Sequence, residues 1–353
     1  MERAAELEIA AWRLRSGQHV QHSSRLFVGV LVSCALVSAA FATWLPLQVS
    51  IVTVFLFAGP HNWFELRYFM TRLPVRFGKS RNFFLIAFSG IFLLTISFVA
   101  LPFLYGAAVA KGVEWASVLA VWNSLLLMWV AVLVWMRGKQ KLRRDWSWAI
   151  PLAFALISVN WLAPQFFSLS IVYLHPLIAL WFLDRHLRRT RPELVRSYHR
   201  CLYLLPVLLG GMIWFLSQKT ALPEDNGLFW RITQHAGAEL LPGLSPHMLV
   251  AVHLFLEMLH YGVWLFALPL ITAQQRSTKL KQSRAFWDVK SVPLARHPKG
   301  FPKLVTVALL LGAVLVVLLW FGFAMDYSTT RDIYFTLAIA HVLAEAPFLL
   351  KMI

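Results

Sequence analysis

The sequence predicts an all-α protein that crosses a membrane many times, and its composition is the first reason. Of its 353 residues, 59% are hydrophobic and 14% are charged, about half the charged share of a soluble globular domain. This composition excludes a water-soluble enzyme. The net charge of +17 would suggest nucleic acid as a partner in a soluble protein. Here the basic residues lie between apolar runs, where they set membrane orientation, so we expect no nucleic-acid partner.

Long apolar runs are the second reason, because a helical span needs roughly 20 predominantly apolar residues. The sequence contains ten candidate spans, at 26–45, 47–69, 83–104, 114–136, 147–162, 166–184, 202–217, 248–272, 304–325 and 333–350. Residues 1–25 are charged and have no early apolar core, so they are expected to form a cytoplasmic or interfacial segment. Residues 26–353 are then one transmembrane helical domain.

The third reason is the placement of the basic residues. Lys and Arg gather in residues 1–25, 70–82, 137–146, 185–200 and 273–303, whereas the intervening loops carry few positive charges. Basic loops face the cytoplasm. The alternation therefore predicts ten spans with both termini cytoplasmic, and we expect the protein in the inner (cytoplasmic) membrane of a bacterium.

Ionisable residues deep in the spans mark the candidate site, because such residues are costly in a membrane and usually serve function. Only three Glu lie well inside spans, and each follows a His by four residues: His61 and Glu65, His253 and Glu257, His341 and Glu345. Residues four apart share one face of a helix. His260, three residues after Glu257, lies near the same face. The remaining His, including His186 and His235, are expected to be solvated at span edges or in loops.

Depth brings four of these imidazoles together. His175, His260 and His341 lie within one residue of the midpoints of their predicted spans, and His61 lies three residues past its own, about 5 Å along a helix. All four spans also run in the same direction in the predicted topology. We therefore expect four imidazoles to converge near the middle of the bilayer.

Imidazoles and carboxylates that converge in a dry place predict a metal site. Such ligands suit iron, copper or zinc, and a centre without thiolates is not an iron–sulfur cluster. His61, His175, His260 and His341 are predicted to be ligands, with His253 as a further candidate. Glu257 is predicted to be a ligand or a base, and Glu65 and Glu345 to orient their own histidines. Structural pairing and a proton or ion pathway are the alternatives. The Glu-x-x-His spacing of di-iron proteins occurs once, at Glu257 and His260, so one metal ion is favoured over two.

One short stretch resembles a known family. Gly59-Pro60-His61 followed by Glu65 is similar to the Pro-His-Gly-x-x-Asp motif of the Brp/Blh β-carotene dioxygenases, which are polytopic membrane proteins with a mononuclear non-haem iron held by histidines. The resemblance covers about a dozen residues, and Asn62 and Glu65 replace the Gly and Asp of the motif. It implies that His61 binds a metal ion and that Glu65 supports it.

Two classes of function remain in view. The first is an intramembrane metalloenzyme, a non-haem Fe(II) oxygenase or oxidoreductase that acts on a carotenoid, another isoprenoid or a lipid; zinc and copper stay open as the metal. The second is a proton-coupled transporter that uses the same His and Glu residues as a relay. A haem held by facing histidines is a third possibility. Membrane lipid and a lipophilic small molecule are the expected partners, and the sequence leaves the oligomeric state open.

Overall fold

The structure is a computed structural model that describes residues 24–140, 145–217, 227–272, 289 and 292–352. The predicted N-terminal segment 1–25 lies almost wholly outside this part. Within it the chain is helical and contains no strand. The helices are Ser24–Trp44, α2 (Pro46–Arg72), the short η1 (Gly78–Ser80), α3 (Arg81–Ala110), α4 (Trp115–Gln140), α5 (Ala149–Leu162), α6 (Pro164–Thr190), α7 (Pro192–Leu202), α8 (Leu204–Leu216), α9 (Leu228–His235), α10 (Pro246–Gly262), the π-helical turn η2 (Val263–Ala267), α12 (Pro293–Arg296), α13 (Pro302–Met325) and α14 (Tyr327–Met352).

Eight helical segments of the described chain are long and apolar enough to cross a membrane, as expected of a multi-pass integral membrane protein. They coincide with eight of the ten predicted spans. The other two predicted spans also form helices, but each differs from this set in one respect. The α2 helix is long enough to span a membrane, but polar residues, His61, Glu65 and Arg67 among them, make it less apolar than the other eight. The α5 helix has 14 residues, which extend about 21 Å, less than the roughly 30 Å of a hydrocarbon core.

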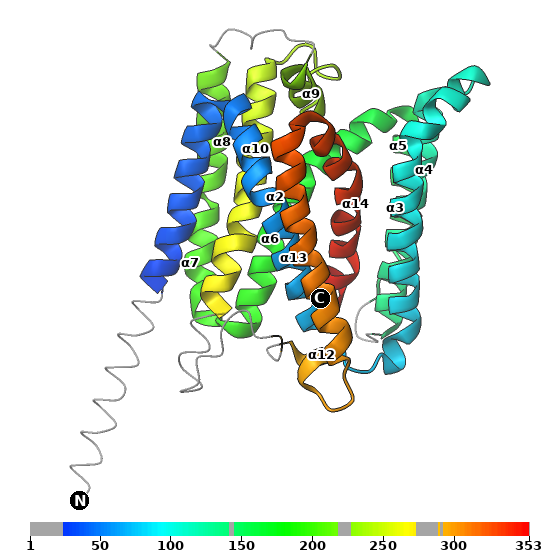
Figure 1. The fold of residues 1–353 in the computed structure, drawn as a ribbon, viewed down its shortest axis with the longest axis vertical. Helices are drawn as coiled ribbons and strands as arrows, with labels where there is room; N and C mark the ends of the chain where they lie inside the picture. The colour runs from blue at the N-terminus through cyan, green and yellow to red at the C-terminus, as the bar shows by residue number, and fades with distance from the viewer. Residues whose placement is uncertain (1–23, 141–144, 218–226, 273–288, 290–291, 353) are drawn as a thin grey trace, which may run out of the picture.

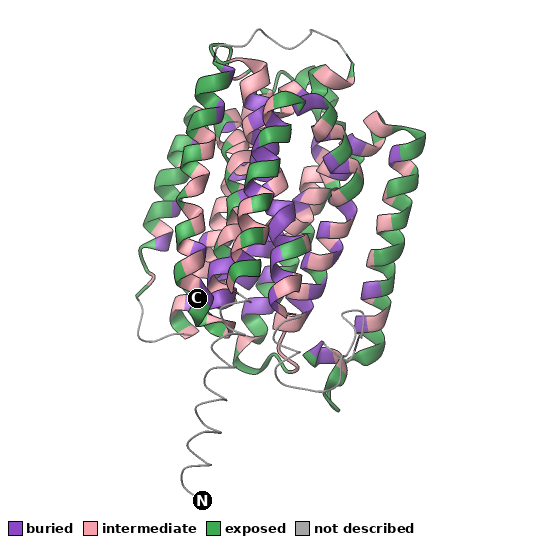
Figure 2. Ribbon diagram, turned by 90° about the vertical axis from the view of Figure 1, so that its left-hand side faces the viewer, coloured by how far each residue is buried: buried purple, intermediate pink, exposed green. Residues whose placement is uncertain are grey.

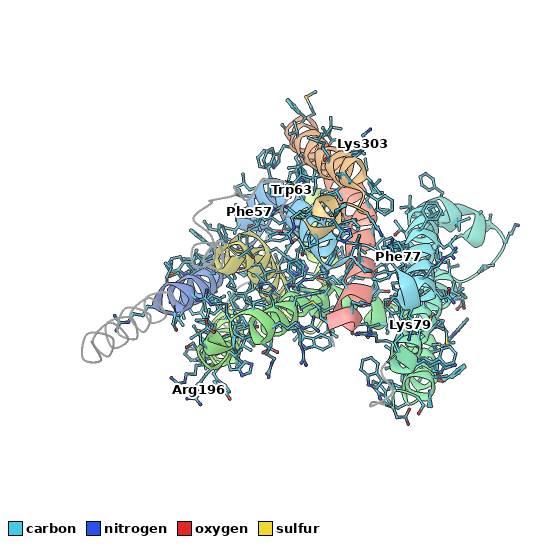
Figure 3. All side chains as sticks on the ribbon, turned by 90° about the horizontal axis from the view of Figure 1, so that it is seen from below. Phe57, Trp63, Phe77, Lys79, Arg196 and Lys303 are labelled. Carbon is cyan, nitrogen blue, oxygen red and sulfur yellow. The ribbon has the colours of Figure 1, made fainter. Side chains whose placement is uncertain are left out.

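The helices form one bundle with a peripheral group, α3 to α5, at one side (Figure 1). The α2, α6, α10 and α14 helices lie in the middle of the molecule. α9 lies at the upper end in this view and α12 at the lower end. Seen from the lower end, Lys79, Arg196 and Lys303 are spread around the rim (Figure 3). Three of the predicted basic segments therefore lie at one end of the bundle.

Burial runs from the outside of the bundle to its centre, as a membrane environment requires. The outer helices are largely exposed and the central ones largely buried (Figure 2). α13 is the clearest outer helix: Leu315 is 64% exposed and Phe321 is 66% exposed. By contrast, twelve of the 17 residues of α10 are buried. Large apolar side chains on an outer surface face lipid, so the polar residues of the central helices are enclosed by protein.

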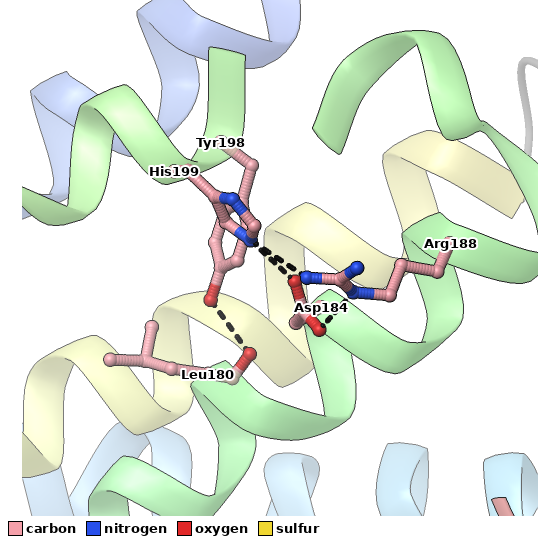
Figure 4. Close-up of polar contacts among 5 residues, drawn as sticks. All are labelled: Leu180, Asp184, Arg188, Tyr198 and His199. Carbon is pink, nitrogen blue, oxygen red and sulfur yellow. Dashed lines mark hydrogen bonds and ion pairs between the residues drawn. The ribbon is translucent and has the colours of Figure 1, made fainter. Parts of the chain in front are cut away.

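The junction of α6 and α7 corrects one prediction. Residues 185–200 were expected to form a cytoplasmic loop, yet α6 continues to Thr190 and α7 begins at Pro192. Asp184 of α6 accepts a 2.7 Å hydrogen bond from His199 Nε2 of α7, which joins the two helices, and a second of 2.7 Å from Arg188 Nε of its own helix (Figure 4). Tyr198 also donates a 2.7 Å hydrogen bond to the carbonyl oxygen of Leu180. The basic stretch is therefore a helical corner rather than an irregular loop.

A close contact between α3 and α4 depends on a glycine. The Trp129 indole lies against the backbone of Gly90 and donates a 3.1 Å hydrogen bond to the carbonyl oxygen of Ile86. A Cβ atom on Gly90 would come within 1.9 Å of the Trp129 Nε1 atom. Only glycine therefore allows this approach. Polar side chains join the next pair of helices, since Asn123 Nδ2 donates to Asn160 Oδ1 at 2.8 Å.

Candidate metal centre

Four helices of the bundle each bring one imidazole to a common point. His61 comes from α2, His175 from α6, His260 from α10 and His341 from α14. The ring centroids of His175 and His260 are 4.7 Å apart, and those of His175 and His341 are 5.0 Å apart. The His61 ring lies 5.3 Å from both His260 and His341. The structure thus brings together the four imidazoles that depth along the spans selects.

Glu65 and Glu345 complete the cluster. One ligand atom from each of His61, Glu65, His260 and His341 lies within 4.8 Å of the others, and the same holds for His175, His260 and Glu345. These two sets are called the ligand groups, and His260 belongs to both. These six residues are called the His/Glu centre below. The side chains of His61, Glu65, His260 and Glu345 are almost fully buried, with exposed fractions from 0% to 2%.

Hydrogen bonds orient two of the rings. His61 Nδ1 lies 3.0 Å from the carbonyl oxygen of Phe57; since a carbonyl only accepts, Nδ1 carries the proton and Nε2 is left with its lone pair. His175 Nδ1 lies 2.9 Å from Glu345 Oε2, the contact by which a carboxylate fixes the ring of a ligating histidine. In both cases the Nε2 atom is the one free to bind an ion.

The spacing of the free nitrogens fits a shared ion. His175 Nε2 and His341 Nε2 are 3.2 Å apart. Two nitrogens bound to one ion at roughly 2.0–2.1 Å, at tetrahedral or octahedral angles, would be about 2.8–3.4 Å apart. A hydrogen bond between the two rings gives the same distance. The neighbouring polar atoms therefore have to decide between these interpretations.

Those neighbouring atoms lack partners. Both carboxylate oxygens of Glu65, both ring nitrogens of His260, His341 Nδ1 and Glu345 Oε1 are buried without a hydrogen bond to any described residue. Buried polar groups are nearly always satisfied, and a buried carboxylate without a partner is especially costly. A divalent cation would bind one nitrogen of His260 and a carboxylate oxygen, and the two carboxylates would balance its charge. The donor set of the His/Glu centre therefore fits a metal ion.

Helix irregularities accompany the centre. Pro60 precedes His61 in α2, Pro176 follows His175 in α6, and Pro347 lies two residues after Glu345 in α14. A proline inside a helix removes one backbone hydrogen bond and bends the helix. On the fourth helix, the π-helical turn η2 begins at Val263, three residues after His260. Such turns often lie at functional sites.

Two of the predicted pairings differ from what the structure contains. Glu345 contacts His175 of another helix rather than His341, its predicted partner, and the Nδ1 atom of His61 is bound by a backbone carbonyl rather than by Glu65. Residues four apart share a helix face, but the nearest hydrogen-bond partner need not be the other member of the pair. Glu345 meets a residue of a neighbouring helix, and His61 meets a backbone carbonyl of its own helix. Glu65 instead presents its carboxylate to the ligand group itself.

Glu257 and His253 lie outside both ligand groups. The Glu257 carboxylate accepts a 2.7 Å hydrogen bond from the Tyr261 hydroxyl and lines the cavity described below, so its role as a ligand or a base stays a prediction. Three residues along a helix rotate the side chain by about 60° and shift it by about 4.5 Å, which is enough to separate Glu257 from His260. His253 lies seven residues before His260, about 10 Å away along the helix.

Two histidines that were expected to be solvated are packed against other residues, His186 fully buried and His235 partly. His186 is 5% exposed, and its Nδ1 atom accepts a 2.7 Å hydrogen bond from Arg72. His235 lies at the end of α9, with its ring 5.2 Å from the His253 ring and 4.5 Å from the Phe335 ring. By sequence, His235 was expected in a loop before residue 248, because the eight residues of α9 are too few for a span. The strong amphipathic pattern of α9 is the signal that it is a packed helix.

A cavity of about 300 Å³ opens beside the His/Glu centre. Its walls are mostly apolar and come from α3, α4, α6 and α14, with Phe98, Trp122, Ile171, Val172, Phe335 and Ile339 among the lining residues. His61, His175, His260 and His341 line one part of it, and His235 and His253 line another. The volume is at the lower end of the roughly 300–1,000 Å³ typical of small-molecule sites.

Comparison with known proteins adds no family. The chain matches no protein-family model, no curated protein and no solved structure. The function therefore has to be argued from the centre and the cavity.

Proposed function

We propose that the protein is an intramembrane metalloenzyme, a non-haem iron oxygenase or oxidoreductase that acts on a lipophilic substrate at the His/Glu centre. The observation that carries the proposal is the set of buried, unpartnered donor atoms of Glu65, His260 and Glu345 beside an apolar cavity. His61, His175, His260 and His341 would hold the ion, with Glu65 as a further ligand. An iron ion bound there would supply the redox chemistry.

The surrounding residues would orient the ligands and shape the substrate cavity. Glu345 would hold the His175 ring in place, and the carbonyl oxygen of Phe57 would hold the His61 ring. Both contacts leave Nε2 as the ligand atom. The apolar walls of the cavity would exclude water and take up a hydrocarbon chain directly from the bilayer. A carotenoid, another isoprenoid or a lipid chain would suit such walls.

Metal analysis tests the proposal. Protein is purified in mild detergent, under reducing conditions, from cells grown with added iron. Elemental mass spectrometry should then find close to one metal ion per chain. The same protein should lack the Soret band of haem. If the purified protein carries no stoichiometric metal, the proposal fails.

One observation favours a second candidate, a proton-coupled transporter. His341, His175 and Glu345 form a continuous chain of contacts of 3.2 Å and 2.9 Å, and such chains pass protons in pumps and transporters. The two candidates separate on metal content. A relay needs no bound metal, and proton uptake into vesicles that carry the protein would then be abolished by His175→Ala.

We also propose ten crossings, with both ends of the chain in the cytoplasm of a bacterium. The support is the gathering of Lys79, Arg196 and Lys303 at one end of the bundle (Figure 3), which the positive-inside rule would place in the cytoplasm. In this topology α2 crosses as a buried central helix, and the short α5 crosses together with the start of α6.

A further inference from the structure

A second pair of imidazoles lies in the cavity, away from the His/Glu centre. The ring centroids of His235 and His253 are 5.2 Å apart, and both rings line the cavity. His253 lies about 10 Å from His260 along α10, since seven residues separate them. None of the hydrogen bonds found in the described chain involves either ring. This pair therefore offers free donor and acceptor atoms at a fixed distance from the centre.

The wall between the pair and the centre is mostly apolar on α6 and α14, and Glu257 is its polar member on α10. Ile171 and Val172 of α6 and Phe335, Ala338 and Ile339 of α14 line the cavity over this stretch. On α14, Tyr334 and His341 are also seven residues apart and both line the cavity. The α10 and α14 helices therefore both run from one end of the cavity to the other. The cavity thus has the pattern of a chain-binding site with a polar end.

The chemistry of the pair selects the polar group. A neutral imidazole has one donor and one acceptor nitrogen, and a hydroxyl group also donates one hydrogen bond and accepts others. Two imidazoles can therefore satisfy a hydroxyl completely. Arg331 is 4% exposed and its guanidinium lies 4.7 Å from the centre of the Phe335 ring, which itself contacts His235. The Glu257 carboxylate lines the same cavity, so positive and negative side chains lie near the pair, and its choice of ligand rests on hydrogen bonding.

We propose that the His235–His253 pair binds the hydroxyl group of a long-chain alcohol whose hydrocarbon chain runs along the apolar wall toward the His/Glu centre. The substrate class is then an isoprenoid or lipid alcohol rather than a pure hydrocarbon. The bond that reacts lies about 10 Å from the hydroxyl carbon. This last statement rests on the proposed function, whereas the binding of the alcohol does not.

The binding of two fluorescent probes, which differ only in the hydroxyl group, tests the proposal. Parinaryl alcohol fluoresces in apolar cavities, and its hydrocarbon analogue with a methyl group in place of the hydroxyl is the matched probe. The ratio of their dissociation constants is measured for the purified wild-type protein and for the double variant His235→Phe, His253→Phe. Two hydrogen bonds should favour the alcohol by roughly tenfold, so the ratio should shift about tenfold between the two proteins.

Control variants keep the test decisive. Ile339→Ala removes part of the apolar wall and should weaken both probes alike, leaving the ratio unchanged. His253→Gln keeps a donor and an acceptor and should retain most of the preference, whereas His253→Leu should lose it; this pair decides the matter if the double variant does not fold. If the ratio in the double variant equals that of the wild type, or if His253→Gln and His253→Leu behave alike, the proposal is overturned.

The metal content of the same samples separates the two proposals. In protein that carries no metal, a preference for the alcohol that the histidine variants lose supports the hydroxyl site and refutes the metalloenzyme. A metal-loaded protein whose ratio is insensitive to the histidine variants refutes the hydroxyl site and leaves the metalloenzyme in place.

Discussion

Replacement of His260 by alanine is the most direct test of the His/Glu centre. His260 is the one residue that belongs to both ligand groups, its side chain is 2% exposed, and neither ring nitrogen has a hydrogen-bond partner in the described chain. In the absence of metal, His260→Ala therefore breaks no hydrogen bond. In its presence, the variant would remove a direct ligand of the proposed centre.

The expected loss of metal affinity follows from this difference. Changes to residues that only orient a ligand typically cost 10–100-fold in affinity, so the loss of a ligand should exceed about 100-fold. That factor corresponds to about 2.7 kcal/mol. A wild-type protein at a metal concentration of about 100 times its dissociation constant gains a similar free energy of stabilisation, and His260→Ala should lose most of it.

Thermal unfolding with and without Fe(II) under anaerobic conditions measures this effect, together with the metal content after purification. His253→Ala is the matched control, because it is the same substitution on the same face of α10 and lies outside both ligand groups. It should keep its metal and its metal-dependent stabilisation. Retention of stoichiometric metal by His260→Ala, or an equal loss in His253→Ala, would refute the assignment of the centre.

Further predictions concern other parts of the molecule. Glu345→Gln should lower metal affinity by about 10–100-fold, less than a ligand loss, because Glu345 positions the His175 ring; equilibrium dialysis measures it. Gly90→Ala should destabilise the protein by about 1–3 kcal/mol, because the new Cβ overlaps the Trp129 ring, and should lower the unfolding temperature in detergent. Reporter fusions at residues 230 and 299 should report opposite sides of the membrane.

Each of these has a matched comparison. Glu345→Gln should be compared with Glu257→Gln, since Glu257 lies outside the ligand groups and should retain full affinity. Gly106→Ala is a control on the same helix, where an added Cβ meets no atom within 4 Å; equal destabilisation by both changes would contradict the packing argument. If both fusions report the same side, the ten-span topology is wrong.

The convergence of four imidazoles was predictable because it depends on two quantities that the sequence contains. Position within an apolar run estimates depth in the membrane, and the direction of each span follows from the basic loops. Both are insensitive to how the helices are arranged around the bundle axis. His61, His175, His260 and His341 therefore come together although no two of them are close in sequence.

The pairing of carboxylates with imidazoles was not predictable by the same means. It depends on which helices are neighbours and on how each is rotated, and the sequence alone contains neither. Glu345 thus meets His175 on α6, and Glu257 meets Tyr261 one turn along its own helix. His235 was missed for a related reason, because α9 is a short helix within a stretch that hydropathy marks only as a loop.

The polarity of α2 has a consequence for the assembly of the protein in the membrane. This helix has 27 residues but is not among the eight segments that are apolar enough to span by composition, and His61, Glu65 and Arg67 are all buried within it. Charged residues at the centre of an isolated helix cost about 2.5–3.5 kcal/mol each on insertion. During synthesis α2 emerges before α6, α10, α13 and α14, the helices that later enclose its polar face. Its stable insertion must therefore await later helices, so that the segment that carries His61 and Glu65 is among the last to settle in the bilayer.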